Sequence, residues 1–385
     1  MTGPRVLYIS PLDMVASNGM AQLQHQLLSC LCSLYPDSVD LLSLSAPPAT
    51  AREWLRRAGL PVTVLDGFYP RLAWLNNMLW YGGGVILCNK LRWIDRFYFP
   101  LRTALPRAWI DRYDLIVSYY AWAHGLLRLD RAGRKVVMDL GDVMADRHER
   151  IGTRRWVSLA ADDERRILQS DARCVAVSDE DAAEFERLYG VRPSVLSFVP
   201  PDSAQLIQLA SQEGPPRAGF LGAPGFGNEE IMRLLAQPAF LRGLSGAGVQ
   251  FLVAGGICGT VEPSVLRALE QGGARVLGRV PSTLDYYRQI SAVVNPIGPS
   301  TGVKIKSVEA LVAGRTLITT RWGADPALHA AFPGQIACID WPIDPGSLAQ
   351  LVVAAVRNPS QAPDSSAAKA YVDGATRNLC ELHAL

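Results

Sequence analysis

Two lysines and a glutamate in the second half of the chain have the types and spacing to bind a phosphorylated ligand. Residues 300–320 read STGVKIKSVEALVAGRTLITT and follow the β-rich run AVVNPI. The turn GPSTG (298–302) opens a predicted helix, whose first backbone N–H groups are unpaired and, with the helix dipole, attract anions. Lys304 in the first turn opposes that dipole, and an anion beside it would neutralise its charge. The pattern predicts a phosphate site at the start of this helix.

Helical spacing of about 100° per residue predicts which side chains of this segment are buried. The predicted buried stripe consists of Ile305, Val308, Leu311 and Val312. Glu309 then borders the stripe, and Lys306 points about 200° away from Lys304. Two interpretations of Glu309 stay open. It is either a half-exposed acid on the shoulder of a helix, or a carboxylate that accepts two ribose hydroxyls while neighbouring amides hold a diphosphate.

Strand-like and helix-like segments alternate along the chain, which predicts parallel sheets covered by helices. The first half contains RVLYISP, the amphipathic MAQLQHQLLSCLCSL, SVDLLSLS, DLIVSYY, KVVMDLGD and RCVAVS. Residues 200–217, PPDSAQLIQLASQEGPPR, break the rhythm with two Pro-Pro pairs and are the expected interdomain linker. A second series of the same kind starts with AGFLG. We therefore expect one Rossmann-like domain over 1–199, a second over 218–370 and a closing helix over 371–385.

Composition places the chain among globular proteins. It has 385 residues and a formal net charge of +2, without the basic excess of a dedicated nucleic-acid binder. Its seven cysteines are scattered without CxxC or His/Cys clusters, so we expect free thiols and no metal site. The run VLYIS is too short for the apolar core of a signal peptide, and no apolar stretch reaches the roughly 20 residues of a membrane span. The expected location is the cytoplasm, free or peripheral on the inner face of the membrane.

The lysine-containing segment resembles the C-terminal donor-binding motif of the retaining glycosyltransferases of family four, in which a GTGxKxKxxEAxxAGxxxxxT pattern recurs. Other matches follow in family order: RVLYISP with a later NG, VAVSDEDAAEFERLYG, GFLGAPGFGNEEI, and LGRVPSTLDYYRQISAVVNPI. The resemblance covers residues 5–355, and the ordered set is more specific than any single motif. It implies GT-B architecture, an α/β fold of two doubly wound Rossmann-like domains that face each other across a cleft.

The resemblance implies a role for each residue that matches the donor-binding motif. Glu309 binds the donor ribose, and Lys304 pairs with the diphosphate as the catalytic cation. Ser300, Thr301 and Gly302 present backbone amides to the diphosphate and the sugar.

Three positions outside that motif also bind the donor by resemblance. Val280 offers its backbone to the nucleobase, and Gly222 allows a close approach of the backbone at the first turn of the second domain. Gly19 lies in a loop that approaches the donor on closure.

Two departures from the family pattern bear on the chemistry. Thr301 stands where the family has a second glutamate that contacts hydroxyls of the donor sugar, so the sugar is left open. The family's Arg/Lys pair, supplied partly by the first loop of the second domain, is absent from GAPGFGN, which leaves Lys304 largely alone as the cation. The same loop has GxxGxG spacing rather than GxGxxG, which argues against a dehydrogenase.

Two aspartates in VVMDLGDVMADRHER stand where a parallel strand would end. Asp142 aligns with the aspartate of a family His-Asp pair whose histidine is Gly141 here. It could orient or deprotonate an acceptor hydroxyl, whereas the alternative for Asp139 and Asp142 is an N-cap or turn aspartate. His124 is interpreted as a packing or hydrogen-bonding residue, because the family's cleft histidine aligns nearer Tyr119.

Residues 68–113 interleave aromatic residues with seven Arg/Lys against two Asp. Such a stretch suits a surface that lies on anionic lipid. The alternative is an inserted helical pair packed on the first domain, with arginines that extend to solvent.

The expected function is transfer of a sugar, with retention, from a nucleotide-diphosphate sugar to a hydroxyl of a glycan or lipid-linked acceptor. The expected context is bacterial surface-polysaccharide or lipid-linked glycan assembly. No cofactor or metal is expected beside the substrates, because helix amides and Lys304 can stabilise the departing diphosphate. Two alternatives stay open: a nucleotide-sugar epimerase on the same fold, and a catalytically silent relative that acts as a partner protein.

Overall fold

The computed structural model divides into two compact units, each built on one parallel sheet. The first unit comprises Met1–Ser197 with Thr301–Val303 and Arg377–Leu385, and the second comprises Phe198–Ser300 with Lys304–Thr376. The structure describes residues 3–11, 19–82, 103–145, 159–210, 215–300, 302–358 and 365–380.

The first unit contains a seven-stranded sheet in the order β3-β2-β1-β4-β5-β6-β7. Its strands are β1 (Val6–Ser10), β2 (Val39–Ser43), β3 (Thr63–Val64), β4 (Leu115–Tyr119), β5 (Val136–Asp139), β6 (Arg173–Ala176) and β7 (Ser194–Val195). Val6 pairs in parallel with both Val39 and Leu115, so β1 lies between β2 and β4. The strand order therefore reverses between β1 and β4, which makes this a topological switch point.

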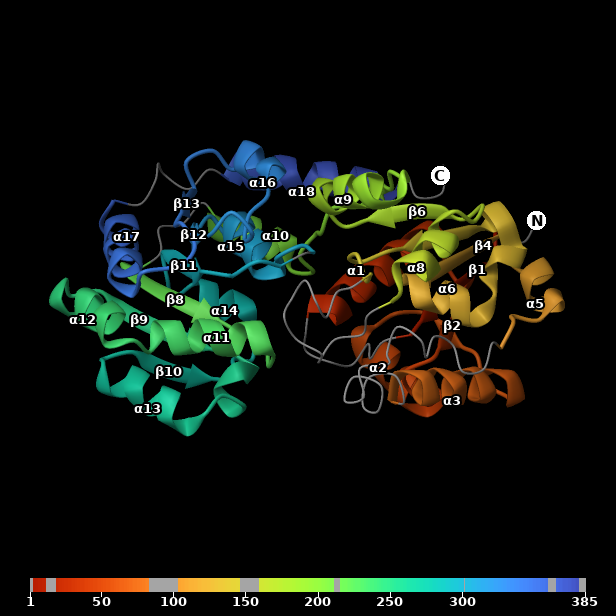
Figure 1. The fold of residues 1–385 in the computed structure, drawn as a ribbon, viewed down its shortest axis with the longest axis horizontal. Helices are drawn as coiled ribbons and strands as arrows, with labels where there is room; N and C mark the ends of the chain where they lie inside the picture. The colour runs from red at the N-terminus through yellow and green to blue at the C-terminus, as the bar shows by residue number, and fades with distance from the viewer. Residues whose placement is uncertain are drawn as a thin grey trace. The chain divides into compact units, whose positions relative to one another are not determined.

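Helices pack around this sheet (Figure 1). They are α1 (Gly19–Leu34), α2 (Pro48–Ala58), α3 (Phe68–Gly82), α5 (Arg107–Arg112), α6 (Ala121–Leu127), the 3₁₀ helix η3 (Leu129–Lys135), α8 (Ala161–Leu168) and α9 (Asp179–Tyr189). The predicted helix at 20–34 is confirmed by α1. The hydroxyl of Ser178 caps α9 by accepting the amide of Asp181, and Gly190 ends the helix with φ of 71°, a conformation that favours glycine.

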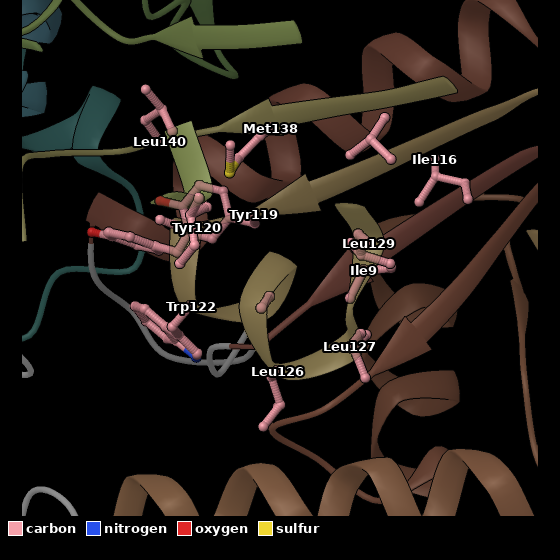
Figure 2. Packing of buried hydrophobic residues seen from close by; sticks show 14 of the residues in the cluster. Ile9, Ile116, Tyr119, Tyr120, Trp122, Leu126, Leu127, Leu129, Met138 and Leu140 are labelled. Carbon is pink, nitrogen blue, oxygen red and sulfur yellow. The ribbon is translucent and has the colours of Figure 1, made fainter. Parts of the chain in front are cut away.

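An aromatic group lies in the core of the first unit at the end of β4 (Figure 2). The ring of Tyr120 stacks on Trp122 with centroids 4.7 Å apart, and Tyr119 meets it edge-on at 4.8 Å. Met138 and Leu140 belong to the same cluster.

The second unit contains a six-stranded parallel sheet in the order β10-β9-β8-β11-β12-β13. Its strands are β8 (Arg217–Leu221), β9 (Gln250–Ala254), β10 (Arg275–Gly278), β11 (Ala292–Asn295), β12 (Thr316–Thr319) and β13 (Ile336–Cys338). Ala218 pairs with both Phe251 and Ala292, so β8 lies between β9 and β11 and a switch point lies between β8 and β11.

The helices of the second unit continue the αβ alternation, as predicted (Figure 1). They are α10 (Ser203–Ala210), α11 (Phe226–Leu235), α12 (Pro238–Gly246), the 3₁₀ helix η4 (Gly256–Gly259), α13 (Pro263–Gln271), α14 (Thr283–Tyr287), α15 (Ile305–Val312), α16 (Pro326–Ala331), α17 (Pro345–Arg357) and α18 (Ser365–Cys380). Among the helices that the structure describes, none is long and apolar enough to cross a bilayer.

The segment expected to link the domains differs from that expectation in one respect. Its residues 203–210 form α10, which packs against α15 in the second unit. Its apolar positions Leu206 and Leu209 are buried, which explains why this Pro-bounded segment folds onto the unit. The division between the two units falls between Ser197 and Phe198.

Candidate functional site

Parallel sheets bind ligands beyond the carboxyl ends of their strands, above all where the strand order reverses. The loop after β8 contains Gly222, and the loop after β11 contains Ser300 and Gly302. In the first unit, Gly19 begins the helix after β1 and Tyr120 follows β4. The chain thus places most of the predicted site residues beside the two switch points.

Glu309 is buried in α15, with 5% of its surface exposed. Every residue from Ser307 to Val312 is buried, because α15 packs against α10 as well as against β11 and β12. Tyr287 donates its hydroxyl to Glu309 Oε2 at 2.9 Å. Burial raises the pKa of Glu309 to about 7, and the hydrogen bond from Tyr287 opposes that rise. The half-exposed interpretation of Glu309 was therefore wrong, and its ribose-binding role stays a prediction.

Lys306 lies on the face of α15 that carries Glu309. Its Nζ donates to Asn228 Oδ1 at 2.7 Å and lies 4.4 Å from the centroid of the Phe220 ring. Phe220 belongs to β8 and Asn228 to the first turn of α11, so the ammonium group lies at the switch point between β8 and β11. Burial lowers the pKa of Lys306 to about 7, and the negative charge of Glu309 acts in the opposite direction.

The helical spacing that separates Lys306 from Lys304 by about 200° applies only if both residues are helical. The helix begins at Ile305, and Lys304 precedes it as the N-cap residue with φ −94° and ψ 84°. Lys306 and Glu309 are three residues apart within the helix and therefore share a face. That spacing is the signal in the sequence that identifies Lys306. The phosphate-binding role of Lys304 stays a prediction.

Two glycines let the loops after β8 and β9 approach each other closely. A Cβ at Gly222 would lie 2.9 Å from Ile257 Cγ2, and one at Gly255 would lie 2.2 Å from the carbonyl oxygen of Gly222. Gly255 also has φ of 104°, which side-chain-bearing residues rarely adopt. The donor-binding role of Gly222 stays a prediction.

The other predicted donor-binding residues lie in loops of the same edge. Val280 is half-buried between β10 and α14. Ser300 Oγ donates to the carbonyl of Gly298 at 3.1 Å, and Gly302 has φ of 78°. Thr301 lies outside the described residues. Their contacts with a donor stay predictions.

The two aspartates of the first unit have different environments, although both are buried. Asp139 ends β5, and its Oδ1 accepts the amide of Gly141 at 3.2 Å, which closes its own turn. Burial raises the pKa of Asp139 to about 7. Asp142 instead accepts a hydrogen bond from the hydroxyl of Tyr120, at 3.1 Å, across from the neighbouring strand. Sequence reasoning missed Tyr120, because nothing in the string SYYAW distinguishes its two tyrosines.

His124 is buried in α6, and its Nε2 lies 3.4 Å from Ser170 Oγ. Burial lowers the pKa of His124 to about 4, so the ring is neutral at physiological pH. This environment favours the packing interpretation of His124.

Gly19 is the first residue of α1, and the sulfur of the next residue, Met20, lies 3.4 Å from the Tyr120 hydroxyl. Within the described part of the chain, no group of three His, Cys, Asp or Glu side chains could hold a metal ion.

Comparison with known families matches both halves of the chain. Residues 18–202 match the family described as Glycosyl transferase 4-like domain, and residues 215–358 match the family described as Glycosyl transferases group 1. No curated protein sequence matches the chain.

Solved structures with the same fold cover almost the whole chain. HepE from Anabaena, in complex with UDP and glucose, is 15% identical with a TM-score of 0.61, covering 99% of this chain and 98% of its own. WaaG, a glycosyltransferase involved in lipopolysaccharide biosynthesis, is 14% identical with a TM-score of 0.58, covering 98% of this chain and 99% of its own. A glycosyltransferase from Rickettsia africae is 11% identical with a TM-score of 0.59, covering 98% of this chain and 94% of its own. The chain therefore belongs to the group 1 glycosyl transferases, with a 4-like first domain and the two Rossmann-like domains of the GT-B fold.

Proposed function

We propose that the chain transfers a sugar from a nucleotide-diphosphate sugar to a hydroxyl acceptor with retention of anomeric configuration. The observation that carries this proposal is the position of Lys306, whose ammonium contacts Asn228 and Phe220, on the face of α15 that carries the buried Glu309, at the switch point between β8 and β11. A cation and a carboxylate three residues apart match the two ends of a nucleoside diphosphate. The ammonium faces the phosphates, and the carboxylate accepts the ribose hydroxyls.

The donor half of the site is prepared by protein contacts. The Tyr287 hydroxyl donates a hydrogen bond to one carboxylate oxygen of Glu309, and Asn228 Oδ1 accepts one from the ammonium of Lys306. Both charged groups are desolvated and have pKa values of about 7. A bound diphosphate supplies the negative charge that keeps Lys306 protonated, so binding and charging of the site reinforce each other. In the loop after β11, Gly302 has φ of 78°, and its amide donates to Asp181 Oδ1 at 3.2 Å.

The reaction breaks the bond between the anomeric carbon and the β-phosphate oxygen, whose electron pair stays with the diphosphate. The acceptor oxygen forms its bond to the same face of that carbon, and its proton passes to the carboxylate of Asp142. Lys306 stabilises the charge that develops on the departing diphosphate, a role for a fixed cation that is stronger in the transition state than in the ground state. No metal is required in this scheme, because the charge is met by Lys306 and by helix amides.

The neighbours with the same fold support a nucleotide-sugar donor and a role in glycan assembly. HepE was crystallised with UDP-glucose, and WaaG is involved in lipopolysaccharide biosynthesis. We propose a UDP-sugar as the first donor to test, and a glycan or lipid-linked hydroxyl as the acceptor, in bacterial surface-polysaccharide or lipid-linked glycan assembly.

An exposed apolar stripe on α3 supports contact with a membrane. Five of the large hydrophobic side chains that the described residues leave exposed lie on this helix: Phe68, Leu72, Leu75, Met78 and Leu79. They recur at helical spacing, while Ala73 and Asn77 on the opposite face are buried. Residues 83–102, which contain most of the basic residues of the segment, lie outside the described residues. We propose that the region 68–113 binds anionic lipid from the cytoplasmic side, which would bring the enzyme to a lipid-linked acceptor.

The test is a thermal-shift screen with UDP, GDP, ADP and dTDP and their common sugar derivatives, followed by NMR of the products. Nucleotides with one base should raise the Tm. At a ligand concentration of 100 Kd, binding stabilises the folded state by about 2.7 kcal/mol. Transfer to a hydroxyl acceptor should then give a product with the anomeric configuration of the donor. Lys306→Met should lose most of the shift, and Lys304→Met serves as the matched control on the same turn.

Two outcomes would replace this proposal. Conversion of the donor sugar to its epimer without an acceptor would make the chain an epimerase. Nucleotide binding without turnover across a broad set of acceptors would make it a catalytically silent partner protein. An absence of any shift with every nucleotide would refute the proposed site itself.

A further inference from the structure

Tyr120 has a backbone conformation that residues with a side chain seldom adopt. Its φ is 65° and its ψ is 145°, close to a region that is essentially reserved for glycine. The residue stands between β4 and α6, at the switch point of the first sheet, and its amide donates to the carbonyl of Asp139 at 2.7 Å. Such a conformation persists where surrounding contacts force it, and it is frequent at functional sites.

Several parts of the first unit contact Tyr120 directly or through Trp122, whose ring lies beside that of Tyr120 in Figure 2. The Tyr120 ring stacks on Trp122 at 4.7 Å between centroids. Trp122 in turn donates its Nε1 to Asn77 Oδ1 at 3.4 Å, and the amide nitrogen of Asn77 donates to the carbonyls of Pro11 and Leu44. The ring position is thus fixed through α3 and the ends of β1 and β2.

The chain also leaves room for this ring. A Cβ at residue 141 would lie 2.8 Å from ring atoms Cε1 and Cζ of Tyr120, so the glycine at that position is required. Gly141 itself has φ of 64°, which a side chain would also disfavour. Tyr120 and Gly141 both have positive φ, and they lie face to face in the loops that follow the neighbouring strands β4 and β5.

The result of this arrangement is one hydrogen bond. The buried hydroxyl of Tyr120 donates to Asp142 Oδ1 at 3.1 Å. The sulfur of Met20 lies 3.4 Å from the same hydroxyl and is a weak acceptor. A carboxylate at the end of a free side chain samples several rotations, and a donor on one oxygen selects among them.

We propose that Tyr120 is a positioning residue, which holds the Asp142 carboxylate in the orientation that receives the acceptor hydroxyl and its proton. This inference rests on the role proposed for Asp142, and it explains why a strained tyrosine stands where a glycine would fit the backbone better. Tyr120 belongs to the first unit, whereas the proposed donor-binding residues Lys306 and Glu309 belong to the second. Its loss should therefore lower turnover and leave donor binding unchanged.

The experiment measures kcat and KM with the sugar nucleotide that gives the largest thermal shift, for Tyr120→Phe, Asp142→Asn and the double variant. Phenylalanine keeps the ring stack and removes only the hydroxyl. Tyr119→Phe is the matched control, because the Tyr119 hydroxyl is buried and has no hydrogen-bond partner among the described residues. Circular dichroism and nucleotide affinity verify that each variant is folded.

Tyr120→Phe should lower kcat by about 10-fold to 100-fold, the scale for displacing a catalytic group by about 1 Å, with the donor KM and nucleotide affinity unchanged. Added to Asp142→Asn, it should lower kcat no further, because the hydroxyl acts through that carboxylate. Tyr119→Phe should match the wild type.

Three results would overturn the inference. Full kcat in Tyr120→Phe, while Asp142→Asn is impaired, would refute the positioning role and leave the proposed function intact. Losses that multiply in the double variant would show that Tyr120 acts independently of Asp142. Full activity in Asp142→Asn would remove the proposed role of Asp142 and the inference together.

Discussion

Lys306 offers the sharpest test of the donor site, because its charge depends on the ligand. The pKa of Lys306 is about 7 in the unliganded protein. At pH 8 about one tenth of the molecules therefore carry a protonated Lys306, whereas UDP is fully ionised because the second pKa of a phosphate is about 6. If the diphosphate lies beside the ammonium group, binding restores the proton. We expect an uptake of about 0.9 proton per UDP bound at pH 8.

Isothermal calorimetry in two buffers with different ionisation enthalpies measures this uptake directly. Lys306→Met should abolish the uptake and weaken UDP binding by about 1.5–3 kcal/mol, the range for a hydrogen bond to a charged group, which is about 10- to 150-fold in Kd. Turnover should fall further, by about 10²–10³ in kcat, because the charge on the diphosphate grows as the glycosidic bond breaks.

Lys304→Met is the control for the same measurement. Lys304 precedes α15 as its N-cap and shares neither the Asn228 contact nor the helix face of Glu309. Its loss should therefore leave most of the proton uptake in place. Negligible uptake by the wild type, or an equal or larger loss of kcat in the Lys304 variant, would show that the phosphates lie at the turn before the helix and not at Lys306.

Three further predictions concern other parts of the chain. Glu309→Gln should weaken nucleotide binding by about 1.5–3 kcal/mol through the loss of charge-assisted hydrogen bonds to ribose; unchanged affinity by calorimetry would return Glu309 to a structural role. The folded pKa of Asp139 lies above its unfolded value of about 4, so its stabilising contribution is present at low pH and is lost as the pH rises through about 7. Asp139→Asn should thus raise the Tm increasingly between pH 4 and pH 8, and an equal shift at both ends would contradict the burial argument. Replacing Leu75 and Leu79 together by Gln should weaken sedimentation with anionic vesicles at low salt while leaving UDP binding unchanged; wild-type protein that ignores such vesicles would make α3 a surface for another partner.

Local sequence patterns were sufficient for the architecture. The alternation of short β-rich runs with amphipathic segments depends on periodicities of two and 3.6 residues, which each segment carries by itself. Helix ends followed in the same way from residues such as Ser178 and Gly190, whose effect is exerted on their immediate neighbours. The parallel order of both sheets, and hence the edge at which the ligand binds, follows from the helical connections between strands.

Tertiary structure decided which side chains of those elements do chemistry. A helical wheel assigns one buried stripe to α15, but the helix is buried almost all round, because α10 comes from a segment about 100 residues earlier to cover it. Glu309 is a buried acid for that reason, and Lys306 is half-buried on the same helix face. The hydrogen bond from Tyr120 to Asp142 likewise joins the loops that follow two neighbouring strands, and the strained backbone of Tyr120 is invisible in the sequence. The periodicity of a sequence indicates on which face of its own helix or strand a side chain lies. The pKa and the hydrogen bonds of that side chain depend instead on which other elements pack against it.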